Sequence, residues 1–79
     1  MTVYLATGKN FSSRMKVKNI IVDPSAASWV LILQNSAGVT LFSAKGVDAV
    51  AREYQVDIDA DAFNQASATN ITAVMLVGA

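Results

Sequence analysis

The chain of 79 residues contains no cysteine and no histidine. Without cysteine there is no disulfide to stabilise a small core, and the usual thiolate and imidazole ligands of zinc are also missing. A nucleophilic enzyme would have to rely on serine or threonine activated by lysine or a carboxylate. The one such pattern, Ser13-x-x-Lys16, lacks the partner motifs of the enzymes that use it. We therefore expect a protein that is not an enzyme and that binds no cofactor.

Long apolar runs are also missing. No run approaches the roughly 20 residues that a helix needs to span a bilayer, and the N-terminus lacks the apolar stretch of about 7–15 residues found in signal peptides. The sequence therefore predicts a protein that is made in a cytoplasm and has no membrane partner.

Charge is sparse and unevenly distributed. Residues 1–23 carry four cations against one carboxylate, whereas residues 24–79 carry two cations against five carboxylates. Four cations are too few to predict a nucleic-acid surface. In an oligomer, this polarity would pair a basic segment of one subunit with an acidic edge of the next; a solvated surface with scattered charges explains it equally well.

Apolar residues, by contrast, are abundant. They make up 53% of the chain, against 15% charged residues. So short a chain buries only about 60–65% of its unfolded surface, which leaves more apolar surface than one core can hide. We expect a homo-oligomer.

The clearest local pattern is a β-hairpin over residues 29–42. Two apolar runs rich in β-branched and aromatic residues flank the sequence Asn35-Ser36-Ala37-Gly38. Asparagine at the start of a loop and glycine at its end favour a tight reversal, because both adopt conformations that other residues avoid. Neither run is long enough for a typical helix.

Further short β-like segments are separated by turn residues. We predict five strands, and an additional short one at Thr2–Leu5, within an extended N-terminal arm that lies across its own domain or reaches a neighbour. The five are 15–22, 29–34, 39–43, 52–59 and 70–77. Residues 45–51 are predicted as a loop or one helical turn, and residues 60–69 as a loop over a buried Phe63. This spacing predicts an all-β fold, a small antiparallel sandwich or barrel that is jelly-roll-like or immunoglobulin-like. The predicted organisation is an arm over 1–14 and a β domain over 15–79.

Two predicted strands are apolar on both faces. In residues 29–33 one face carries Val30 and Ile32 and the other Trp29, Leu31 and Leu33. In residues 70–77 one face carries Val74 and Leu76 and the other Ile71, Ala73, Met75 and Val77. A sandwich strand has one face on the core, so the second face must be covered by loops of the same chain or by another subunit. We favour a subunit or capsid interface that includes Tyr4, Phe11, Trp29, Val30, Ile32, Phe42, Val74 and Leu76.

Carboxylates occupy every second position at Asp57, Asp59 and Asp61. On a strand this spacing places all three on one face, where they would form a weak site for a hard cation such as calcium. The helix-loop-helix calcium pattern fails, because Ala62 stands where that loop needs glycine. The favoured interpretation is a solvated strand face whose charges discourage edge-to-edge aggregation.

From Met15 onward the chain resembles the small all-β virion proteins of tailed bacteriophages. The resemblance is carried by the opening Lys16-Val17-Lys18-x-Ile20-x-Val22, the corner Ser25-Ala26-Ala27-Ser28-Trp29, the hairpin over 31–42 and the closing strand over 69–77. Proteins of that kind that decorate or cement capsids are typically small cysteine-poor β folds, often trimeric, bound over junctions between capsid proteins.

Three functions follow as hypotheses. The resemblance implies a capsid decoration or cement protein on the virion surface, a homotrimer whose partner is the major capsid protein. The second is a tail or fibre accessory module that recognises a host surface glycan through Trp29 or Tyr54. The third is a small intracellular enzyme or metal-binding regulator, which only the carboxylates of residues 57–61 favour.

Overall fold

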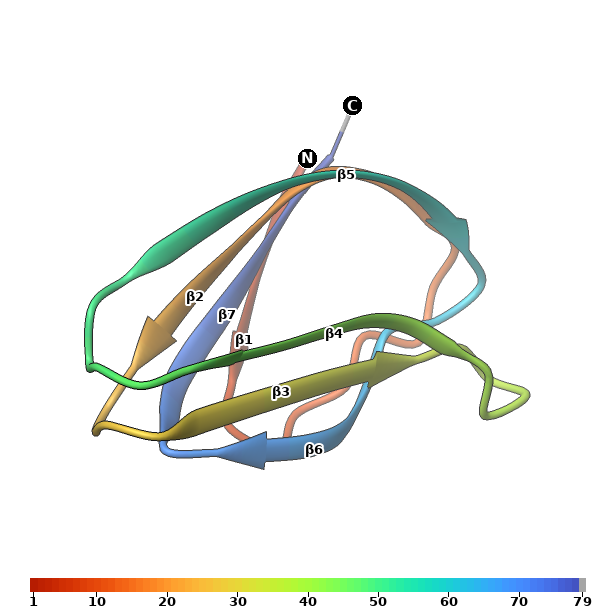
Figure 1. Cartoon of the computed structure of the whole chain (residues 1–79). Helices are drawn as coiled ribbons and strands as arrows, with labels where there is room; N and C mark the ends of the chain where they lie inside the picture. Colours follow the sequence, from red (N-terminus) through yellow and green to blue (C-terminus); the bar gives the residue numbers. More distant parts are fainter. Residues whose placement is uncertain (79) are drawn as a thin grey trace.

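The computed structural model describes residues 1–78, which form seven β-strands in two antiparallel sheets packed face to face (Figure 1). The first sheet has the order β1-β7-β2-β5, and the second has the order β4-β3-β6. The strands are β1 (Thr2–Ala6), β2 (Met15–Pro24), β3 (Trp29–Gln34), β4 (Thr40–Gly46), β5 (Arg52–Ala60), β6 (Asn64–Thr69) and β7 (Ile71–Gly78). The all-β fold expected from the sequence is confirmed, and of the two predicted architectures, sandwich and barrel, the chain forms the sandwich.

The strand order is that of a jelly roll with one strand reduced to a single bridge. Phe11, between β1 and β2, forms an antiparallel bridge with Phe63 at the free side of β6. With Phe11 counted as a short second strand, the sheets run first-eighth-third-sixth and second-seventh-fourth-fifth, which is the jelly-roll arrangement. In an immunoglobulin-like sandwich the first two strands pair, whereas here β1 pairs with the last strand, β7.

The predicted hairpin is confirmed as β3 and β4. Leu31 lies opposite Ala44 and Leu33 opposite Phe42 in an antiparallel register. The Asn35 side-chain carbonyl accepts hydrogen bonds from the backbone N–H groups of Ala37 and Val39, at 2.9 and 3.0 Å, and Gly38 has φ of 80°. The residue types that marked the turn in the sequence therefore form it.

Alternation within the strands builds the core. Ile20 and Val22 of β2 face the interior beside Val74 and Leu76 of β7, and the other sheet contributes its own inward-facing residues. The largest fully buried side chains are Trp29, Phe63, Ile20, Leu31, Leu33, Leu76, Val17, Val22 and Val74. Phe63 is thus buried, as predicted.

Residues 45 and 46, predicted within a loop or one helical turn, extend β4. Two further segments differ from the prediction. Residues 64–69, predicted as loop, form β6, which pairs with the second side of β3 although its small polar residues have little strand preference. The expected extended arm over 1–14 is not confirmed. Residues 2–6 pair with β7 as β1, and residues 7–14 cross to β6 within the same chain. Both segments are ordered by partners distant in the sequence.

Candidate functional site

Three of the residues predicted at an interface lie inside the core instead. Trp29, Val74 and Leu76 are all 0% exposed. The alternation of β7 correctly separates two apolar faces, but the face with Val74 and Leu76, predicted to contact another subunit, points into the core. The interface assignment for these three residues is wrong, and Trp29 is not available as a stacking platform for a glycan.

The other predicted interface residues occupy separate places. Tyr4 is 63% exposed on the outer face of the four-stranded sheet. Val30 and Ile32 are partly exposed on the outer face of the three-stranded sheet. Phe11 is partly buried at its bridge with Phe63, and Phe42 packs against the core between the sheets. The structure does not bring these five residues together into one surface.

Sequence reasoning missed an apolar row across the outer face of the four-stranded sheet. Tyr4 of β1 lies opposite Met75 of β7, and Met75 lies opposite Ile21 of β2. Met75 and Ile21 are only partly buried, so the three side chains form a continuous apolar row over three strands. We call Tyr4, Met75 and Ile21 the outer row. The signal was the alternation of β2 and β7, which reveals two apolar faces without showing which one faces outward.

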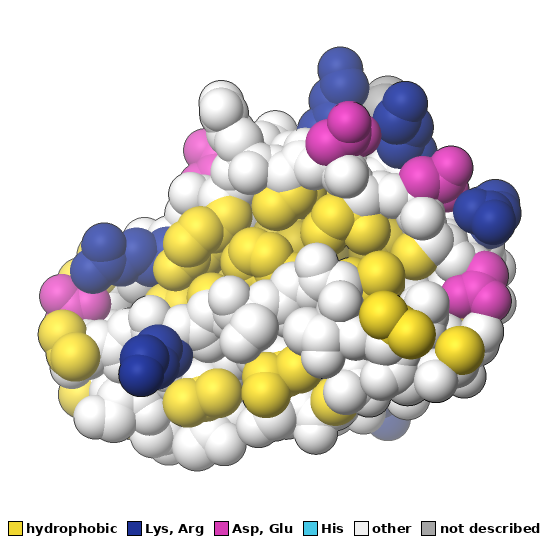
Figure 2. All heavy atoms as spheres, turned by 45° about the vertical axis from the view of Figure 1, so that its right-hand side comes forward, with side chains coloured by type: hydrophobic (Ala, Val, Ile, Leu, Met, Phe, Trp, Pro, Cys, Tyr) yellow, Lys and Arg dark blue, Asp and Glu magenta, His cyan; other side chains and the backbone are white. Residues whose placement is uncertain are grey.

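A second apolar surface lies between the two sheets, where β4 and β5 are the terminal strands and do not pair with each other. Figure 2 looks into this opening and shows a hollowed band of hydrophobic side chains, with charged groups gathered above it. We call this surface the open side. It is formed by side chains that are packed on the core and partly exposed, namely Leu41, Phe42, Ala44, Tyr54, Val56 and Ile58.

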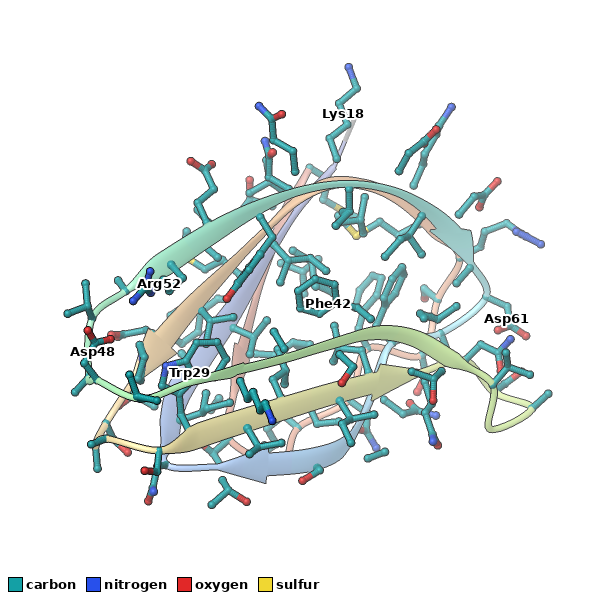
Figure 3. The ribbon with its side chains drawn as sticks, in the orientation of Figure 1. Lys18, Trp29, Phe42, Asp48, Arg52 and Asp61 are labelled. Atoms are coloured by element: carbon teal, nitrogen blue, oxygen red, sulfur yellow. The ribbon has the colours of Figure 1, made fainter. Side chains whose placement is uncertain are left out.

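One aromatic pair crosses the open side. The rings of Phe42 on β4 and Tyr54 on β5 meet edge to face, with centroids 5.2 Å apart and planes at 64°. Such pairs contribute about 0.5–1.5 kcal/mol beyond the area they bury. Figure 3 shows Phe42 in the space between the sheets, midway along the opening. The pair therefore holds the two edges together without closing the cleft between them.

The three aspartates proposed as a weak cation site do not converge. Asp59 pairs with Arg14 at 3.0 Å, and β5 ends at Ala60, so Asp61 does not share the strand face. The Asp61 carboxylate turns to the β3–β4 loop and accepts hydrogen bonds from the hydroxyl and the backbone N–H of Ser36. These bonds lower the pKa of the Asp61 carboxyl. Within residues 1–78 no group of three acidic side chains is arranged to hold a metal ion.

An apolar loop forms one end of the sandwich. Val47 is 84% exposed and Val50 is 55% exposed, and Asp48 of the same loop forms an ion pair of 3.1 Å with Arg52 at the start of β5. Beside the loop is a shallow hollow of about 340 Å³, whose lining includes Trp29, Lys45, Gly46 and Val47. Figure 3 places Trp29, Asp48 and Arg52 at this end and Asp61 at the opposite one.

No helix in the described part of the chain is long and apolar enough to cross a membrane. Comparisons of the chain with protein-family models, with curated proteins and with solved structures found no match.

Proposed function

We propose that the protein is a non-enzymatic structural protein of a tailed-phage virion, which decorates or cements the capsid by bridging capsid subunits. It is made in the host cytoplasm and assembles as a homo-oligomer, for which the resemblance to capsid decoration proteins implies a trimer. The observation that carries this proposal is the presence of two separate apolar surfaces, the outer row and the open side, on one small sandwich. A bridging protein needs two such surfaces, one for its own copies and one for the shell.

The size of the domain suits this use. A standard interface takes about 800 Å² from each partner, which is close to a fifth of the 4275 Å² surface of this chain. Modest affinity at each copy becomes large stabilisation when many identical copies bind one shell.

We assign the outer row to contact between copies, because Tyr4 is its most exposed member and lies on the edge strand β1. Tyr4→Lys would place a charge in that contact and convert the oligomer to a monomer in size-exclusion chromatography with light scattering. Thr69→Lys on β6 of the other sheet adds the same charge elsewhere and leaves the oligomer intact. A wild-type chain that runs as a clean monomer of 8.3 kDa at micromolar concentration would refute the oligomer.

Deletion of the gene tests the location. We expect the protein in purified virions by mass spectrometry, and heads without it that break more readily on heating or dilution, as seen by negative-stain microscopy. Intact heads with lost adsorption would instead indicate the alternative, a tail or fibre module that recognises a host glycan. That alternative now relies on Tyr54, whose ring already packs against Phe42.

A further inference from the structure

The two long sides of the sandwich differ in how the sheets are connected. On the β1–β6 side, residues 7–14 bridge the sheets. Phe11 and Phe63 exchange two backbone hydrogen bonds of 3.0 and 2.8 Å, and the Gln65 side-chain amide donates to the carbonyls of Ala6 and Lys9 at 2.9 and 2.8 Å. On the β4–β5 side the two terminal strands do not pair; the Phe42–Tyr54 ring contact crosses the gap, and hydrogen bonds from Ser36 to Asp61 join the sheets at one end of it. One side is therefore closed by the chain's own backbone, and the other leaves two strand edges free.

A free strand edge presents backbone N–H and C=O groups ready to pair with another strand. At β5 this edge runs beside the cleft, toward which Tyr54, Val56 and Ile58 point. A strand added to β5 would place every second side chain into the cleft, because side chains alternate across a strand. The cleft thus has the geometry for β-strand addition, in which backbone bonds supply affinity and the pocket residues supply selectivity.

The outward side chains of β5 define the chemistry of such a strand. Glu53, Asp57 and Asp59 are exposed on that face. On the β2 side, Asp59 lies opposite Lys16 and pairs with Arg14, and Lys18 lines the same shallow hollow as Asp57. An added strand would approach the same carboxylates from the free side of β5. Side chains directly opposite each other on neighbouring strands attract when their charges differ and repel when they match. An added strand would therefore favour lysine or arginine at the positions opposite Glu53 and Asp57.

The same charges disfavour a second copy of β5 in this place. In an antiparallel pair of β5 strands centred on Val56, Glu53 would lie opposite Asp59, and this would happen twice. Like charges directly opposite each other destabilise a strand pair. The carboxylates of β5 therefore disfavour pairing with β5 of a second copy and favour a strand that carries basic residues.

We propose that the open side binds an extended segment of a partner protein in which apolar and basic residues alternate, added to β5 as the next strand of its sheet. The apolar side chains fill the cleft beside Phe42, Tyr54 and Val56, and the basic side chains lie over Glu53 and Asp57. The identification of that partner as the capsid protein rests on the proposed function; the binding chemistry does not.

The test uses the full chain and three synthetic peptides of about eight residues, a common strand length. One alternates valine with lysine, one alternates valine with glutamate, and one has the lysines and valines in two separate blocks. Calorimetry is expected to show at least tenfold tighter binding of the alternating valine–lysine peptide than of either other peptide. Amide NMR shifts on binding are expected along β5. Equal binding of the block peptide, or shifts centred on β1 instead, would overturn the proposal.

Asp57→Lys is expected to weaken binding of the alternating valine–lysine peptide at least tenfold, and Glu53→Lys is expected to act in the same direction. The matched control is Asp23→Lys, which makes the same charge change on β2, a strand with neighbours on both sides. Circular dichroism shows whether each variant is folded. If Asp57→Lys and Asp23→Lys lost peptide affinity equally, the loss would reflect net charge alone, and the proposal would be overturned.

Purified capsid shells separate this proposal from the proposed function. If wild-type protein and Asp57→Lys bind shells equally well, the strand-addition site is wrong while the capsid function stands. If the chain binds the alternating peptide but no shells, the capsid function is wrong while the site stands. If the protein formed dimers as its concentration rose and the NMR signals of the β5 amides shifted with them, the β5 edge would bind a second copy. That result would overturn the proposal.

Discussion

The indole of Trp29 lies directly against the backbone of Gly46, its partner across the β3–β4 hairpin. A Cβ atom at position 46 would stand 2.6 Å from Cε2 and 2.9 Å from Cζ2 of the indole. Glycine is therefore the residue that lets the largest buried side chain fit under β4.

Gly46→Ala is expected to destabilise the fold, because the new methyl group would overlap the Trp29 indole. The indole is fully buried, so it cannot shift aside without disturbing its neighbours. Overpacking of this kind costs about 1–3 kcal/mol. The free energy of unfolding, measured with urea, checks it. Ala66→Gly, at an exposed position of β6, controls for the backbone effects of glycine and alanine in a strand. A cost below a few tenths of a kcal/mol at Gly46 would contradict the close packing.

A double-mutant cycle isolates the contact. Phenylalanine at position 29 lacks the ring atoms nearest to Gly46, so Gly46→Ala is expected to cost less in the Trp29→Phe background than in wild type. Trp29→Phe also removes an indole N–H that is buried without a hydrogen-bond partner among residues 1–78. Equal costs of Gly46→Ala in the two backgrounds would show that the indole is not the obstacle.

Asn70 holds the turn between β6 and β7 in a left-handed conformation, with φ of 55°. Its side-chain amide donates to the carbonyl of Ala27 at 3.0 Å, and its own carbonyl accepts from the Ser25 N–H at 2.9 Å. Asn70→Ala loses the side-chain bond and strains the backbone, so it is expected to cost about 2 kcal/mol. Asn70→Gly loses only the bond and is expected to cost about half as much. Thermal denaturation of both variants measures these costs. A lower melting temperature for Asn70→Gly than for Asn70→Ala would contradict the prediction.

Gln65 orders the segment that closes the β1–β6 side. Beyond its two donated bonds, its side-chain oxygen accepts from the Gly8 N–H at 3.3 Å. Gln65→Ala is expected to cost about 1–3 kcal/mol and to speed amide hydrogen exchange in residues 7–11. Gln55→Ala, at an exposed position of β5, is the matched control and should change neither quantity appreciably. Unchanged exchange in Gln65→Ala would show that the segment is held by other contacts.

The Asp61–Ser36 contact makes a small part of the stability depend on pH. Because the pKa of Asp61 is lower in the folded chain than in the unfolded chain, its contribution is present above the ordinary aspartate pKa and is lost as the pH falls through the lowered value. Below that range the β3–β4 loop is expected to loosen, which NMR of the Ser36 and Ala37 amides would detect. Asp61→Asn should remove the transition. A transition at neutral pH, or one that persists in Asp61→Asn, would contradict the assignment.

The sequence by itself determined the local structure. Alternation and turn residues located five strands and the β3–β4 hairpin, because side-chain period and turn chemistry depend on neighbouring residues. It also gave the pairs of apolar faces on β3 and β7. The expectation of a bridging oligomer stays a prediction.

Only the tertiary structure decided which face is inside. Val74 and Met75 are both apolar neighbours on β7, and one is buried while the other is partly exposed, because the register with β2 and β1 fixes the inward side. The same holds for β6, which is a strand because β3 has a second edge to pair, and for Asp61, which leaves the row of carboxylates where β5 ends. The open side, too, depends on β4 and β5 being the terminal strands of different sheets, a relationship between residues that no local pattern encodes.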